Sequence, residues 1–106
     1  MTTNEITAEQ RFELVQKHGE VLVLGSDFGD VAFRIATRAE WQRMIDEQAR
    51  DLTQGVALRN LVYSCRVWPE GPDFDRLIER APGMVQSLGN ELVEFCGLGR
   101  RLVRKK

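Results

Sequence analysis

The chain has 106 residues, of which 42% are hydrophobic and 29% charged, a balance typical of one packed domain and too apolar for a disordered chain. No apolar run approaches the roughly 18 residues that span a bilayer, and the N-terminus MTTNEITAEQ lacks the basic start and apolar stretch of a secretion signal. With a net charge of only −1, these features predict a cytosolic protein without a membrane span and without an overall basic character.

The first element is expected to be a short helix. Thr7-Ala8-Glu9-Gln10 has the form of a capping box, in which the threonine oxygen accepts from a backbone amide and the glutamine reaches back to residue 7. Gly19 is well placed as the left-handed residue that ends the helix. The apolar side of this helix would carry Phe12 and Val15, with Leu14 beside them.

The pattern then changes towards the alternation and β-branched residues of strands. Val21–Leu24 and Val31–Ile35 are strand-like, and the glycine-bearing link over residues 25–30 supplies the turn between them. We predict a β-hairpin. Its glycines are not a phosphate-binding loop, because that motif needs a lysine and a helix that follows immediately.

A second capping box, Thr37-Arg38-Ala39-Glu40, opens the next predicted helix. Its inward side would be Trp41, Met44 and Ile45, and its other side carries charged residues that are expected to face solvent. Around residues 53–55 the apolar residues no longer keep the spacing of one continuous helix, and we place a kink or short break there.

The best-spaced apolar residues lie between Leu58 and Leu98. Two stripes with steps of three and four residues predict two helices, separated by a break at residues 69–72 and a short amphipathic segment. Since a small domain cannot bury the stripes separately, we expect a helical hairpin as the core. The stripes are Leu58, Leu61, Val62 and Cys65 in the first helix and Val85, Leu88, Leu92 and Phe95 in the last.

The predicted fold is therefore α+β: a small N-terminal β-hairpin followed by a bundle of three to four helices. It forms a single α-rich domain over residues 1–99, and a basic tail occupies residues 100–106.

The chemistry of the cysteines and the histidine does not favour an enzyme. Cys65 and Cys96 lie beside apolar residues without metal-ligand spacing, which is typical of small core side chains. His18 falls in the last turn of its helix, where the helix dipole favours a protonated imidazole. We therefore interpret this histidine as structural and not as catalytic. We expect no catalytic residues, no metal site and no cofactor.

The order of several short motifs resembles the tail assembly chaperones of long-tailed bacteriophages. The resemblance covers roughly residues 20 to 98 and corresponds to the short, non-frameshifted form of such chaperones. The motifs are a strand ending in Phe33-Arg34, the helix start Thr37-x-x-Glu40-Trp41, Cys65-Arg66-Val67-Trp68-Pro69, Ala81-Pro82-Gly83 and Phe95-Cys96-Gly97-Leu98.

The resemblance implies a protein that coats the tape measure protein in the host cytoplasm and recruits tail tube subunits. A helix-in-groove mode suits such a partner, because a long helical chain exposes apolar stripes that need cover. A copy with an open groove is also expected to self-associate. The candidate groove residues are Trp41, Met44, Tyr63, Trp68, Phe74 and Met84. The alternative interpretation is that most of these six residues belong to the core, because a domain of this size has few other large side chains to fill its interior.

The last seven residues, RRLVRKK, hold five of the fifteen basic side chains and no acid, whereas the rest of the chain carries ten basic and sixteen acidic side chains. The alternative is therefore a small nucleic-acid-binding or regulatory protein that uses this tail. We expect no nucleic-acid binding, because the acidic body has no extended basic face. In the chaperone interpretation the tail binds an acidic stretch of a tail protein through Arg100, Arg101, Arg104, Lys105 and Lys106.

Overall fold

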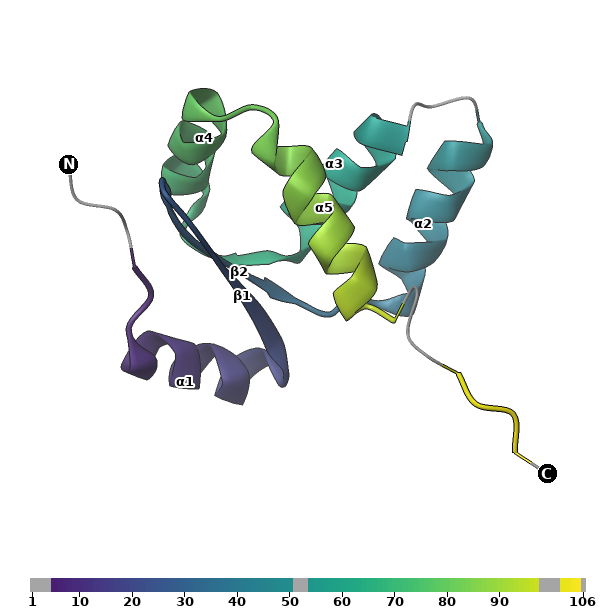
Figure 1. The fold of residues 1–106 in the computed structure, drawn as a ribbon, viewed down its shortest axis with the longest axis horizontal. Helices are drawn as coiled ribbons and strands as arrows, with labels where there is room; N and C mark the ends of the chain where they lie inside the picture. The colour runs from purple at the N-terminus through teal and green to yellow at the C-terminus, as the bar shows by residue number, and fades with distance from the viewer. Residues whose placement is uncertain (1–4, 51–53, 98–101, 106) are drawn as a thin grey trace.

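The computed structural model describes residues 5–50, 54–97 and 102–105. Within these residues the chain forms five helices and a three-stranded antiparallel sheet (Figure 1). The elements in chain order are α1 (Ala8–His18), β1 (Val21–Ser26), β2 (Gly29–Arg34), α2 (Arg38–Ala49), α3 (Gln54–Cys65), β3 (Arg66–Trp68), α4 (Gly71–Arg80) and α5 (Met84–Phe95).

The predicted order of an N-terminal hairpin followed by a helical bundle is wrong. The β1–β2 hairpin follows helix α1, and β2 also pairs with β3, a strand that lies between α3 and α4. The residues of β3 directly follow a helix without a turn signal. They become a strand because β2 lies alongside, with Ala32 opposite Trp68 and Phe33 opposite Arg66.

Helices cover the two faces of the sheet unequally (Figure 1). Leu22 and Phe33 are register partners and share the face that packs against α3 and α5. Helix α1 lies on the opposite side of the sheet, where the Ile6 amide donates to the Asp30 carboxylate at 2.9 Å. Both threonine capping boxes predicted at the starts of α1 and α2 are confirmed.

The predicted packing of the two apolar stripes is confirmed in helices α3 and α5. Leu61 and Leu92 are buried in one core cluster, which also includes residues of β2, α2 and α4. The helices approach closely at Gly89, where an added Cβ would lie 3.1 Å from Leu58 Cβ. A glycine at this position therefore sets the distance between the two helices.

Helix α1 differs from the other helices in that none of its residues is buried. Phe12 and Val15, expected on its apolar side, are 61% and 41% exposed, while Leu14 is half-buried. The helix starts and ends where the sequence predicts, but its apolar side faces solvent.

Candidate functional site

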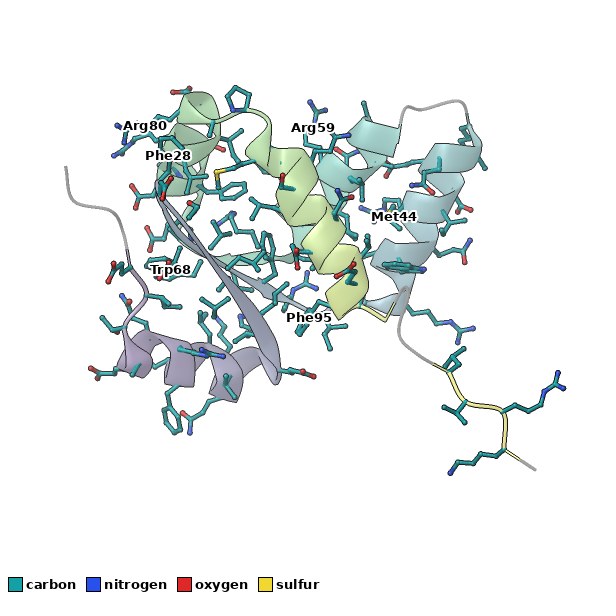
Figure 2. All side chains as sticks on the ribbon, in the orientation of Figure 1. Phe28, Met44, Arg59, Trp68, Arg80 and Phe95 are labelled. Carbon is teal, nitrogen blue, oxygen red and sulfur yellow. The ribbon has the colours of Figure 1, made fainter. Side chains whose placement is uncertain are left out.

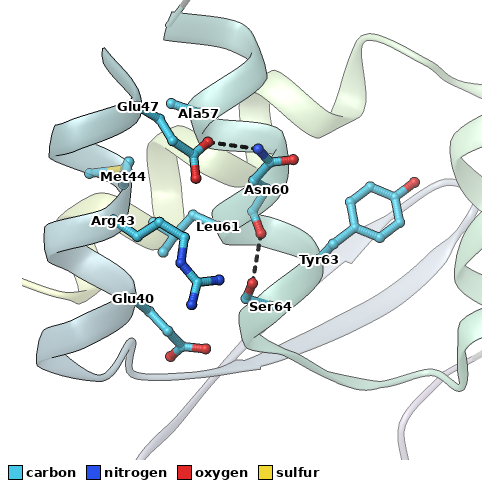
Figure 3. Close-up of a pocket in the computed structure, with 9 residues that line it drawn as sticks. All are labelled: Glu40, Arg43, Met44, Glu47, Ala57, Asn60, Leu61, Tyr63 and Ser64. Atoms are coloured by element: carbon cyan, nitrogen blue, oxygen red, sulfur yellow. Dashed lines mark hydrogen bonds between the residues drawn. The ribbon is translucent and has the colours of Figure 1, made fainter. Parts of the chain in front are cut away.

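An open groove runs between helices α2 and α3 (Figure 3). Its volume is about 330 Å³, which lies at the lower end of the range for ligand-binding pockets. The sequence folds this way because each helix carries a short apolar row that packs against the other and leaves polar side chains along both edges. The lining residues are Glu40, Arg43, Met44, Glu47, Ala57, Asn60, Leu61, Tyr63 and Ser64.

The floor of the groove is apolar and belongs to the core. Met44 comes from α2, and Ala57 and Leu61 come from successive turns of α3. All three are buried within the core cluster, so a partner would contact mainly the edges. Met44 lies between the two helices in Figure 2.

The edges of the groove carry hydrogen-bonding and charged groups. Arg43 and Glu47 lie one turn apart on α2, and the Asn60 amide of α3 donates to the Glu47 carboxylate at 2.7 Å. The Ser64 hydroxyl donates to the Asn60 carbonyl at 2.9 Å. The Glu47–Asn60 bond joins the two helices across the groove (Figure 3).

Tyr63 lines the groove from α3, but its ring points away from α2 (Figure 3). Its side chain is 39% exposed, and its ring meets the buried Phe74 ring edge to face, with centroids 5.2 Å apart and an interplanar angle of 82°. This contact with α4 restricts the tyrosine ring before any partner binds, which lowers the entropy cost of binding.

A bidentate ion pair closes one end of the groove. The Arg34 guanidinium donates to both Glu40 oxygens at 2.7 and 2.8 Å and also to the Ser64 carbonyl at 2.9 Å. Hydrogen bonding from Arg34, supported by bonds from Thr37, lowers the pKa of Glu40 to about 2. Arg34 thus ties β2 to both helices of the groove, and Glu40 has little capacity left for a ligand.

The structure separates the predicted partner-binding residues. Met44 and Tyr63 line the groove, Phe74 is fully buried beneath Tyr63, and Trp41 and Met84 are half-buried against the core. Trp68 is half-buried on β3 (Figure 2). In the tail, Arg104 and Lys105 are exposed, whereas Arg100, Arg101 and Lys106 lie outside the described residues.

The sequence interpretation missed Arg43, Glu47 and Asn60 as groove residues. The charged side of α2 was expected to face solvent, since nothing local distinguishes an exposed helix face from the edge of a groove. The available signal was the spacing of Glu40, Arg43 and Glu47 by three and four residues beside the apolar row.

The cysteines lie close to the ion pair without an activated thiol. Burial raises the pKa of the Cys65 thiol to about 12, which disfavours the nucleophilic thiolate at neutral pH. Cys96 is half-buried, and its sulfur accepts from the Ala36 amide at 3.4 Å. Among the described residues, no three His, Cys, Asp or Glu side chains gather as a metal site would require.

A smaller cavity of about 150 Å³ lies between the β1–β2 turn and α4. Arg80 stacks over the Phe28 ring at 5.7 Å from its centroid (Figure 2), and Arg76 pairs with Asp73 at 3.5 Å. Both arginines already contact groups of the chain itself, so this cavity is a weaker candidate than the α2–α3 groove.

None of the helices in the described part of the chain has the length and apolar character that crossing a bilayer requires.

Comparison with solved structures finds a similar fold in the uncharacterised protein rbstp2171 from Bacillus stearothermophilus. The two chains are 23% identical with a TM-score of 0.72, over 90% of this chain and 99% of that one. Comparison with curated proteins finds no match. A family model described as a domain of unknown function, DUF6848, matches residues 14–105. The chain therefore belongs to the DUF6848 family.

Proposed function

We propose that this protein is a non-catalytic tail assembly chaperone of a long-tailed bacteriophage. In this role it covers the tape measure protein in the host cytoplasm and recruits tail tube subunits. The motif order over residues 20–98 supports the proposal from the sequence side. The observation that carries it in the structure is the open α2–α3 groove, with the exposed Tyr63 ring beside it.

The groove has the composition of a protein-binding surface. Tyrosine and arginine are enriched among residues that dominate binding energy at interfaces. Arg43 lines the groove from α2, and Tyr63 lines it from α3 with its ring on the side away from α2 (Figure 3). Glu47 and Asn60 add a polar rim that is already hydrogen-bonded. Since Glu47 and Asn60 already bond each other, a partner need not supply bonds to this pair, which suits a sequence-tolerant binder.

A helix that lies across the groove would fit its small, open shape. A volume of about 330 Å³ accommodates only one or two side chains of a partner helix, while the rest of that helix would follow the exposed edges. A tape measure protein, being long and helical, presents such side chains repeatedly. Covering them prevents its aggregation before the tail tube encloses it.

The proposal is tested by co-expression. The partner is the protein encoded by the long helical reading frame nearest this gene, and the measurement is its soluble fraction with and without this chain. We expect the partner to be soluble only in the presence of this chain and to co-purify with it. A partner that stays insoluble, or one that is soluble alone and does not co-purify, contradicts the proposal.

Groove variants locate the contact. Tyr63→Ala and Arg43→Glu should each reduce the co-purified partner at least tenfold, because both remove groups at the edge of the groove. Arg59→Glu is the matched control, since Arg59 is an exposed arginine of α3 that does not line the groove (Figure 2). Circular dichroism verifies that each variant is folded. Equal effects of Arg43→Glu and Arg59→Glu would place the contact elsewhere.

A further inference from the structure

Helix α1 keeps an apolar stripe in solvent. Phe12 and Val15 are 61% and 41% exposed, and Ala8 is exposed one turn earlier. We call Ala8, Phe12 and Val15 the α1 stripe. An 11-residue helix is marginally stable in water by itself, and no residue of α1 is buried. A partner that covers this stripe would therefore stabilise the helix as well as bind to it.

A second exposed apolar pair lies in the C-terminal tail. Leu102 is 92% exposed and Val103 is 73% exposed, and Arg104 and Lys105 follow them directly. Isolated leucine and valine side chains at such exposure stabilise nothing within their own chain. Flanked by cations, they form a short segment suited to an apolar surface with acidic surroundings.

The charges around the two surfaces are complementary. Residues 5–20 carry the acids Glu5, Glu9, Glu13 and Glu20 against the bases Arg11 and Lys17, a net charge of −2 with His18 neutral. The last seven residues carry +5. Within α1 itself Glu9 and Glu13 balance Arg11 and Lys17, so the excess acids are Glu5 and Glu20 at its two ends. Two copies of the segment 5–20 would therefore meet with the same sign of charge, whereas this segment and the tail attract each other.

The α1 stripe and the tail lie at opposite ends of the molecule. In Figure 1, α1 occupies one end of the longest axis, and residues 102–105 extend from the other. The protein measures 50 Å along this axis. Contact between the two surfaces in this arrangement requires a second copy.

We propose that the tail of one copy docks on the α1 stripe of the next copy. Leu102 and Val103 cover Phe12 and Val15, while Arg104 and Lys105 lie near the acidic residues of the segment 5–20. The contact is head-to-tail, so each copy keeps one free surface and copies add until a ring closes or a filament forms. These surfaces are separate from the α2–α3 groove, and the inference goes beyond the proposed function without depending on it.

The test begins with the intact chain. Sedimentation velocity at about 10 μM to 1 mM should show a weight-average mass that rises with concentration, since a contact this small binds weakly. The rise should shrink in about 1 M salt, because the Debye length falls to about 3 Å and the charge attraction is screened. A strict monomer throughout this range overturns the inference.

Two variants disable one surface each. The head variant combines Phe12→Asp with Val15→Asp, and the tail variant combines Leu102→Asp with Val103→Asp. Each variant alone should self-associate at least tenfold more weakly than the original chain. Ile45→Asp is the matched control, because Ile45 on α2 is as exposed as Val15, at 41%, and should associate like the original chain.

Mixing the two variants distinguishes a head-to-tail contact from a symmetric one. The head variant retains an intact tail and the tail variant retains an intact α1 stripe, so the mixture should form a one-to-one dimer and nothing larger. A tail variant that associates like the original chain would indicate pairing between two α1 helices and overturn the proposal. A mixture that stays monomeric overturns it as well. Because Leu102 and Val103 are exposed, replacing them should not prevent folding, so the tail variant should fold even if the head variant does not.

Discussion

The Arg34–Glu40 ion pair should make a measurable and pH-dependent contribution to stability. Glu40→Gln removes the charge with little change in shape, and its amide oxygen still accepts from the Thr37 amide that Glu40 bonds at 2.9 Å. The capping box of α2 is therefore retained. What is lost is the negative charge and the bond from Arg34 to the second carboxylate oxygen at 2.8 Å, because the amide nitrogen that replaces this oxygen cannot accept.

The magnitude follows from the pKa of Glu40, which is lowered from an ordinary 4.5 to about 2, chiefly by the hydrogen bonds from Arg34. Without screening, this difference corresponds to roughly 3 kcal/mol of free energy of unfolding. The pair lies near the surface, with the Arg34 and Glu40 side chains 24% and 17% exposed. Solvent screening reduces the expected contribution to about 1–2 kcal/mol.

The pH range follows from the direction of the shift. A lowered pKa in the folded state stabilises the fold above pH 4.5, and this stabilisation is lost as the pH falls towards about 2. Urea unfolding of both proteins should show Glu40→Gln about 1–2 kcal/mol less stable at pH 7, with the difference approaching zero near pH 2. A difference that stays constant with pH, or is absent at pH 7, would refute the reasoning. Asp73→Asn, in an exposed pair with an N–O distance of 3.5 Å, should change stability by less than about 0.5 kcal/mol.

Three further predictions concern helix packing, a helix glycine and the thiols. Gly89→Val should cost about 1–3 kcal/mol in urea unfolding, because an added Cβ already lies 3.1 Å from Leu58 Cβ. In Gly55→Ala the new methyl group has no neighbour within 4 Å, so the variant should be more stable by about 0.5–1 kcal/mol. A stabilised Gly89→Val variant would contradict the close approach of α3 and α5. In the folded protein at pH 7, a thiol reagent should modify the half-buried Cys96 while leaving buried Cys65, whose pKa is raised to about 12, unmodified until unfolding. Rapid modification of both thiols would contradict this burial.

Several elements were determined by the local sequence. The starts of α1 and α2 follow from Thr7 and Thr37, because a capping box is formed by residues only three positions apart. The apolar stripes of α3 and α5 could also be predicted. Spacing of three or four residues places Leu58 and Leu61 on one side of α3, and Leu88 and Leu92 on one side of α5. Their mutual packing was predicted because so small a domain cannot bury two such stripes separately.

Only the tertiary structure decided which surface each apolar residue meets. Periodicity shows that Phe12 and Val15 share a side of α1, but it does not show what covers that side, and in the structure nothing within the described residues buries it. Strand β3 likewise exists because β2 lies alongside Arg66–Trp68, a neighbour more than thirty residues away in sequence. The α2–α3 groove arises in the same way, since its edges belong to two helices whose charged residues look equally solvated in the sequence. Local bonds thus determine where helices begin, whereas long-range packing determines the third strand, the exposed stripe and the candidate site.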